Sequence, residues 1–215
     1  MLIETRKRED LIWVCRQLEK QGLVAASDGN VSCRAGSHQI LITPSGMRKG
    51  ELKPLDLLLV DLNDGHVLAG RGRPSSEIRM HLLVYRRRAD VEAVVHAHPP
   101  LLTAFTLAGI PFTADVLPEV WLTIGPVPTA PYATPSTEEL PEVLNPFIER
   151  SQAILMERHG SITVGKSLQE AYMRLEKLEH AAHTLLYSYL IQGKLPAPLS
   201  EMALERLAEI LRPKS

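Results

Sequence analysis

The 215-residue sequence has few of the features that define several protein classes. Its two cysteines, Cys15 and Cys33, are too few for a disulfide framework in a chain of this length. The 24 lysines and arginines are balanced by 25 acidic residues, so the basic excess that attracts nucleic acid is missing. No apolar run approaches the roughly 20 residues that span a bilayer, and the charged start MLIETRKRED is unlike a signal peptide. We therefore expect a cytoplasmic protein with no nucleic acid partner and no membrane association.

The order of apolar patterns predicts an α/β fold of the α+β-like kind, with a largely antiparallel sheet. Hydrophobic residues make up 45% of the chain, and no repeat or linker divides it, so we expect a single domain over residues 1–215. The stretch 110–135 is broken by prolines, and no helix or strand is assigned within it. Helices are predicted over 4–21, 75–88, 101–108, 137–148, 167–192 and 200–211, and strands over 31–34, 39–43, 57–61, 93–98 and twice within 153–165.

Histidine is abundant, with eight copies, and two of them stand two apart at the end of an apolar strand. Side chains alternate across a strand, so His96 and His98 emerge on one face, roughly 6 to 7 Å apart along the backbone. By itself this pair fits a shared metal or a structural pair equally well. His159 also follows an apolar strand, and Glu77 lies near a helix start. Three imidazoles and a carboxylate suit zinc.

Three short segments have the composition of an anion site. Glycine lets backbone amides approach an anion, hydroxyls add donors, and a helix N-terminus favours negative charge. Each segment taken alone also reads as an ordinary turn or helix cap. The segments are Ser27-Asp28-Gly29-Asn30, Thr43-Pro44-Ser45-Gly46 and Ser75-Ser76.

Four motifs recur in the order and spacing of the class II aldolase and adducin family. They are Pro74-Ser75-Ser76-Glu77, His96-Ala97-His98-Pro99, Ala130-Pro131-Tyr132-Ala133-Thr134 and Arg158-His159-Gly160. From about residue 5 to residue 192 the chain resembles this family, most of all its L-fuculose-1-phosphate aldolase branch.

The resemblance implies a head fold with helices flanking the sheet, and a homotetramer with active sites between subunits. It implies one Zn²⁺ per subunit, with another divalent metal as the alternative, bound by Glu77, His96, His98 and His159. It also implies that the substrate phosphate is bound by Ser27, Asn30, Ser45, Gly46, Ser75 and Ser76.

The implied reaction cleaves a ketose 1-phosphate, such as L-fuculose 1-phosphate or a related deoxy-sugar phosphate, to dihydroxyacetone phosphate and a small aldehyde. It passes through a metal-stabilised enediolate, and Glu77 moves a proton at the carbon beside the carbonyl. The fuculose branch carries a tyrosine acid in the stretch that matches residues 113–121, where this sequence has none. Asp115 and Glu119 are the candidate acids there.

Other reactions on the same scaffold stay open. They are dehydration of methylthioribulose 1-phosphate, 4-epimerisation of a pentulose phosphate, and decarboxylation. Glu77 favours the aldolase, because the dehydratase lacks its equivalent and places a carboxylate in the later loop, where Glu119 lies. A non-catalytic adducin-like interaction module is a further alternative, but losing the metal should erase ligands, and all four are present.

Several polar residues are expected to be structural rather than ligands. We expect core packing or a hydrogen bond for His81, His180 and His183. The run Arg86-Arg87-Arg88 is typical of a solvated surface.

Overall fold

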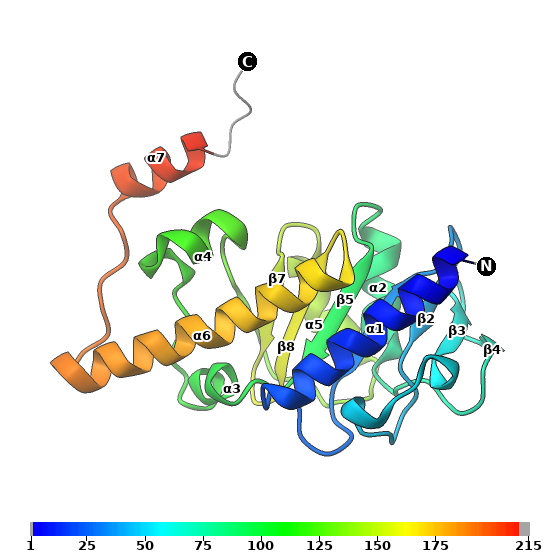
Figure 1. The fold of residues 1–215 in the computed structure, drawn as a ribbon. Coiled ribbons are helices and arrows are strands. Elements are labelled where there is room, and N and C mark those ends of the chain that lie inside the picture. Colours follow the sequence, from blue (N-terminus) through cyan, green and yellow to red (C-terminus); the bar gives the residue numbers. More distant parts are fainter. Residues whose placement is uncertain (1, 211–215) are drawn as a thin grey trace.

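In the computed structural model, which describes residues 2–210, eight strands form one mixed sheet (Figure 1). Their spatial order is β4-β3-β2-β1-β5-β8-β7-β6, and every neighbouring pair is antiparallel except β6 and β7. The predicted, largely antiparallel sheet is therefore confirmed. The strands are β1 Asn30–Arg34, β2 Gln39–Ile42, β3 Leu58–Asp61, β4 Val67–Ala69, β5 Ala93–Ala97, β6 Thr129–Ala130, β7 Ala153–Met156 and β8 Gly160–Gly165.

Helices cover both faces of this sheet (Figure 1). They are α1 Leu2–Lys20, α2 Ile78–Arg87, α3 Pro100–Leu107, α4 Pro118–Thr123, α5 Glu139–Ile148, α6 Leu168–Gln192 and α7 Glu201–Ile210, with short 3₁₀ turns η1 Lys49–Glu51, η2 Pro54–Asp56 and η3 Ala114–Val116. The helices α1, α3, α4 and α6 share one apolar core, and α2 and α5 share the other. Among residues 2–210, no helix is both long and apolar enough to cross a bilayer.

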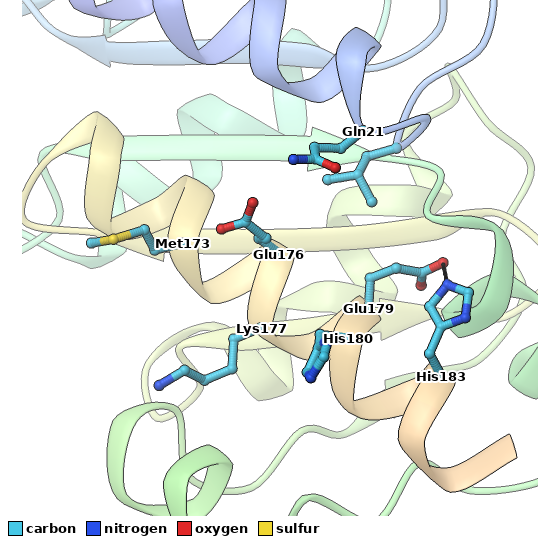
Figure 2. A pocket seen from close by; sticks show the side chains of 8 residues that line it. Gln21, Met173, Glu176, Lys177, Glu179, His180 and His183 are labelled. Carbon is cyan, nitrogen blue, oxygen red and sulfur yellow. Dashed lines mark ion pairs between the residues drawn. The ribbon is translucent and has the colours of Figure 1, made fainter. Parts of the chain in front are cut away.

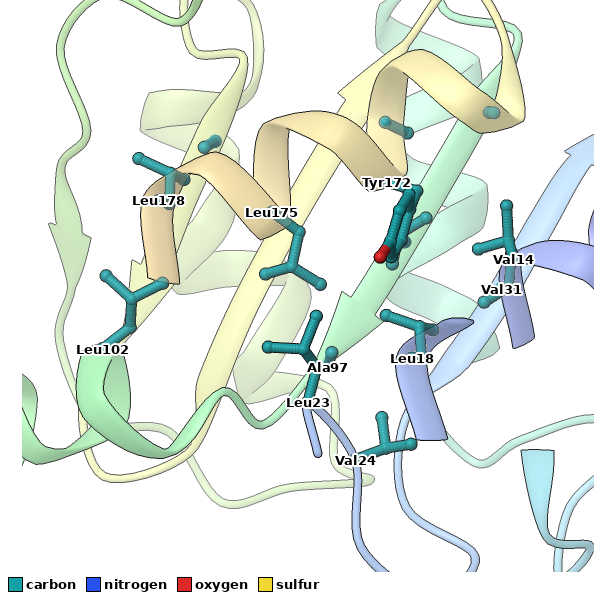
Figure 3. Close-up of a cluster of buried hydrophobic side chains, with 14 of the residues drawn as sticks. Val14, Leu18, Leu23, Val24, Val31, Ala97, Leu102, Tyr172, Leu175 and Leu178 are labelled. Carbon is teal, nitrogen blue, oxygen red and sulfur yellow. The ribbon is translucent and has the colours of Figure 1, made fainter. Parts of the chain in front are cut away.

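The alternation of side chains along β5 divides its residues between the two cores. Ala93, Val95 and Ala97 belong to the core under α1 and α6, whereas Val94 belongs to the core under α2 and α5. Figure 3 shows Leu18 of α1 and Leu175 of α6 around Ala97. His96 has the parity of Val94, so its imidazole lies on the α2 face of the sheet.

The structure differs from the sequence prediction between residues 110 and 135. This proline-broken stretch, in which no helix or strand was assigned, contains the helix α4 and the strand β6. With six and two residues, both elements are too short to show a periodic apolar pattern, and β6 exists through its parallel pairing with β7. The short strand β4 was also not predicted, and α2 begins at Ile78 instead of residue 75.

Arg88 corrects the prediction that the arginine run is solvated. The helix α2 ends at Arg87, and the Arg88 side chain turns into the protein. Its Nη1 donates to the carbonyl oxygens of Ile148 and Ser151 at 3.0 and 3.1 Å, and its other nitrogens bind Asp90. The guanidinium thus caps the end of α5, which the sequence pattern does not reveal.

We predict that Gly29→Ala destabilises the fold more than Gly22→Ala does. Both glycines have positive φ, +73° and +68°, so both variants lose about 1 to 2 kcal/mol from backbone strain. A Cβ on Gly29 would also lie 2.7 Å from Val24 and 2.8 Å from the carbonyl oxygen of His96, whereas Gly22 has open space. This overpacking adds about 1 to 3 kcal/mol. Urea unfolding measures both variants, and equal losses would contradict the close approach at Gly29.

Candidate active site

Three histidines converge at the end of β5. His96 is in this strand, His98 follows it, and His159 lies in the turn between β7 and β8. The pairing of Ala97 with Ser161 places that turn beside the end of β5. The ring centroid of His96 lies 4.9 Å from those of both other histidines, which are 5.1 Å apart, and one nitrogen of each ring falls within 4.8 Å of the others. The three imidazoles therefore form a group that can hold a metal.

Glu77 lies at the N-cap of α2 and points its carboxylate at this group. Its two oxygens are 3.1 Å from Nε2 of His96 and 2.9 Å from Nε2 of His159, and Asn30 Nδ2 donates to it at 2.9 Å. Burial by itself raises the pKa of Glu77, but the charge of His96 and the hydrogen bonds from His159, His96 and Asn30 outweigh it. The pKa of Glu77 is therefore held well below its usual range, and the carboxylate stays charged.

The geometry of the donor atoms fits a divalent metal. His96 Nδ1 donates to the carbonyl oxygen of Ser161 at 2.9 Å, so Nε2 is left to face the other ligands. The Nε2 atoms of His96 and His98 are 3.1 Å apart. Two nitrogens bound to one tetrahedral zinc at about 2.0 to 2.1 Å lie about 3.3 Å apart.

The protonation state of His98 also suits metal binding. Burial, together with the nearby imidazoles of His96 and His159, lowers the pKa of His98 to about 4. At neutral pH this favours the neutral imidazole, which is the form that binds metals.

The three segments expected to bind phosphate lie next to one another. Asn30 Nδ2 donates to Ser75 Oγ at 3.0 Å, which joins the first segment to the third. The backbone N–H of Ser45 donates to the carbonyl oxygen of Arg73 at 2.8 Å. This bond places the second segment beside the residues that immediately precede the third.

The residues expected to bind phosphate differ in their exposure and in the hydrogen bonds that they already make. Ser27, Ser45, Gly46 and Ser76 are exposed, whereas Asn30 and Ser75 are more deeply placed. The Asn30 amide donates to both Ser75 and Glu77, and the Ser75 hydroxyl accepts from the backbone N–H of Glu77 at 3.2 Å. The exposed Ser27, Ser45 and Gly46 can therefore meet an anion directly. The Ser76 hydroxyl already pairs with Ser136 Oγ at 2.6 Å, and Asn30 and Ser75 are engaged with each other and with Glu77.

Nothing in the sequence marks Lys49, which connects two of these segments. The residue is 1% exposed, and its ammonium donates to the carbonyl oxygens of Ser27 and Met47 at 2.8 and 3.0 Å. Burial lowers its pKa from the ordinary value. A lysine next to Arg48 in a polar stretch looks like surface charge, so only the fold reveals that it holds the Ser27 segment against the Ser45 segment.

Asp115 and Glu119 do not join this cluster within one chain. They lie in η3 and α4, and Figure 1 shows α4 well separated from α3, the helix that begins after His98 and Pro99. The backbone oxygen of Asp115 accepts from Leu199 N at 3.0 Å, and Glu119 is exposed.

A separate pocket of about 580 Å³ lies between the end of α1 and α6 (Figure 2). His180 and His183 line it and are exposed, so neither packs in the core, which was one of the two expectations for them. His183 Nε2 pairs with Glu179 at 3.7 Å. The buried Glu179 carboxylate accepts from the backbone N–H groups of Leu101 and Leu102 at 2.9 and 3.0 Å. This contact caps α3 directly after the histidine motif, so α6 helps to fix the position of His98.

Comparison with known proteins identifies the family to which a chain with this fold and site belongs. Residues 9–186 match the family described as class II aldolase and adducin N-terminal domain, and the chain belongs to this family. The crystal structure of L-fuculose-1-phosphate aldolase from Thermus thermophilus is 34% identical, with a TM-score of 0.78, and the match covers 89% of this chain and 98% of that one.

Three relatives with different named reactions are similarly close. An L-fuculose phosphate aldolase of Methanococcus maripaludis is 36% identical over 80% of this chain and 92% of its own length. A 5-deoxy-D-ribulose 1-phosphate aldolase of Bacillus thuringiensis serovar kurstaki is 32% identical over 97% and 96%. A 3-oxo-tetronate 4-phosphate decarboxylase of Escherichia coli is 34% identical over 84% and 86%. Since these identities are nearly equal, they support an enzyme of the lyase kind without choosing its substrate.

We predict that His159→Ala weakens binding of a divalent metal by more than about 100-fold, because loss of a ligand costs more than loss of an outer partner. The matched control is His38→Ala, which removes an exposed histidine. Equilibrium dialysis with elemental analysis gives metal per chain for both variants and the unmodified protein. Equal metal affinity in all three proteins would show that the histidine group is not a metal site.

Proposed function

We propose that this protein is a zinc-dependent aldolase that cleaves a ketose 1-phosphate to dihydroxyacetone phosphate and a small aldehyde. L-fuculose 1-phosphate or a related deoxy-sugar phosphate is the substrate class. The observation that carries the proposal is the convergence of the Glu77 carboxylate with the imidazoles of His96, His98 and His159. The aldolase relatives, which act on sugar phosphates of this kind, support the substrate class.

In this proposal Glu77, His96, His98 and His159 hold the zinc. When bound, zinc supplies a Lewis acid that withdraws charge from the carbonyl and hydroxyl oxygens of the substrate. The exposed hydroxyls of Ser27, Ser45 and Ser76, with the backbone at Gly46, bind the phosphate directly. Asn30 and Ser75, the other two residues of this proposed site, support it through their contacts with each other and with Glu77. The adjacency of the three segments supports this assignment.

Glu77 is the proposed proton carrier. In condensation its carboxylate takes a proton from the carbon beside the ketone carbonyl, and in cleavage it returns a proton to that carbon. The contacts with His96 and His159 hold its pKa too low for a good base. The carboxylate therefore has to move away from these imidazoles when substrate binds, which restores its basicity.

The aldehyde end of the substrate needs a separate acid, for which Asp115 and Glu119 are proposed. Both lie away from the histidines of their own chain, so the acid has to come from a second copy. A cytoplasmic homotetramer with active sites between subunits meets this requirement, and the exposure of Glu119 supports its availability to a neighbour.

A second candidate is decarboxylation of a 3-oxo acid phosphate, which the relative from Escherichia coli favours. The same metal ligands and phosphate segments suit that reaction, because it also develops negative charge beside a carbonyl. The two candidates differ in the departing group, an aldehyde or carbon dioxide.

We expect Glu77→Gln to lower kcat by about 10²- to 10⁴-fold, because the amide cannot carry the proton. KM should change little, since the phosphate contacts remain. The matched control Glu142→Gln alters an exposed glutamate of α5 and should leave both constants unchanged. Zinc content is measured in each variant to separate proton transfer from metal loss. A kcat within tenfold of the unmodified protein, at full zinc occupancy, would rule out Glu77 as the proton carrier.

Incubation with dihydroxyacetone phosphate and a panel of short aldehydes should yield ketose 1-phosphate adducts, which mass spectrometry detects. 3-Oxo-tetronate 4-phosphate should release no carbon dioxide, and methylthioribulose 1-phosphate should lose no water. Release of carbon dioxide without any adduct would replace the aldolase by the second candidate. Loss of water without an adduct would instead establish the dehydratase.

A further inference from the structure

A buried chain of polar side chains runs beneath Glu77 on the α2 face of the sheet. Asn30 and Ser32 come from β1, and His81 and Tyr85 come from α2. Each of the four residues is at most 2% exposed. Because the chain is sealed from solvent, the hydrogen bonds among its members have to satisfy their polar atoms.

The contacts allow one direction of donation along this chain. Ser32 Oγ lies 2.6 Å from Nδ1 of His81 and 2.9 Å from the Tyr85 hydroxyl. Nε2 of His81 lies 2.5 Å from Oδ1 of Asn30, and the amide nitrogen of Asn30 donates to Glu77 and Ser75.

The Glu77 end of this hydrogen-bonded series decides the orientation of the Asn30 amide. A carboxylate only accepts, so the NH₂ group of Asn30 has to face Glu77 and its Oδ1 has to face His81. A flipped amide would set Oδ1 against the negative charge of Glu77. Nε2 of His81 therefore carries the hydrogen.

The hydrogen positions at the other end, from His81 through Ser32 to Tyr85, then follow. Burial, aided by the charge of His96, lowers the pKa of His81 to about 3, so the ring is neutral and Nδ1 accepts. The Ser32 hydroxyl donates to Nδ1, and the Tyr85 hydroxyl donates to Ser32. Every link is satisfied in this one arrangement.

We propose that His81 is a positioning residue that locks the Asn30 amide in the orientation that holds Glu77. The proposal rests on the proposed role of Glu77 as metal ligand and proton carrier. His81 touches neither substrate nor metal; it acts through Asn30. The rigid sheet and the core of α2 thereby set the position of a carboxylate that lies just before the helix.

The first test compares His81→Leu with His81→Gln in the full chain. Leucine removes the donor to Asn30, whereas the amide nitrogen of glutamine can take the place of Nε2. We expect His81→Leu to weaken zinc affinity by about 10- to 100-fold, as loss of an outer partner does, and His81→Gln to recover most of it. The control His180→Leu, at an exposed position of α6, should leave zinc affinity unchanged. Unchanged zinc affinity in folded His81→Leu would overturn the proposal.

The second test needs neither zinc nor activity. Nitrogen NMR of the metal-free protein should show His81 at neutral pH as the neutral ring with hydrogen on Nε2. The milder variant Ser32→Ala, which removes the donor to Nδ1, should perturb the Nδ1 signal. A hydrogen on Nδ1, or a charged ring, would overturn the proposal even if His81→Leu fails to fold. If the unmodified protein binds no zinc, the proposed function fails, and the NMR result still decides whether the lock exists.

Discussion

The antiparallel register of β1, β5 and β8 is the constraint on which the site depends. It sets Asn30 opposite His96 and His96 opposite Ile162, so the turn that carries His159 arrives beside His98. A shift by one residue would turn His96 into the core under α1 and α6 and separate it from Glu77. The register also needs close backbone approach: a Cβ on Gly160 would lie against the carbonyl oxygen of Ala97 and 2.8 Å from Cδ2 of His98.

Burial of a charged carboxylate at this place is costly, and its surroundings compensate for the cost. The imidazoles of His96 and His159 and the amide of Asn30 all contact Glu77. Removing one partner from a buried charge costs about 3 to 5 kcal/mol, because the remaining charge is left without compensation. The same contacts that stabilise the buried charge also depress the basicity of Glu77, so the proposed metal binding and the proposed proton transfer make opposite demands on this side chain.

Much of this arrangement was predictable from sequence, because the strands that carry the histidines are long enough to show apolar patterns. The strands β1, β2, β3 and β5 were expected within one residue of their observed bounds, and the two strands expected within residues 153–165 are β7 and β8. The convergence of His96, His98 and His159 was not predictable from spacing, since it depends on which strands pair; the family resemblance supplied it. Lys49 and Arg88 escaped prediction because a buried cation has the same sequence appearance as a solvated one. Their roles depend on carbonyl groups that only the fold brings within reach.

One chain brings together the groups proposed for the metal and the phosphate, but not those proposed for the aldehyde end of the substrate. The histidine group, Glu77 and the segments proposed to bind phosphate all meet within a single chain. Asp115 and Glu119 lie away from them, in a short helical region that packs against α6 and α7. Relatives of nearly equal identity carry names for different reactions, two aldol cleavages and a decarboxylation. In our proposal one set of metal and phosphate contacts serves all three reactions, so groups outside this set select the departing half of the substrate. The proposal therefore assigns the choice of reaction to the region around α4, which a second copy of the chain would place opposite Glu77.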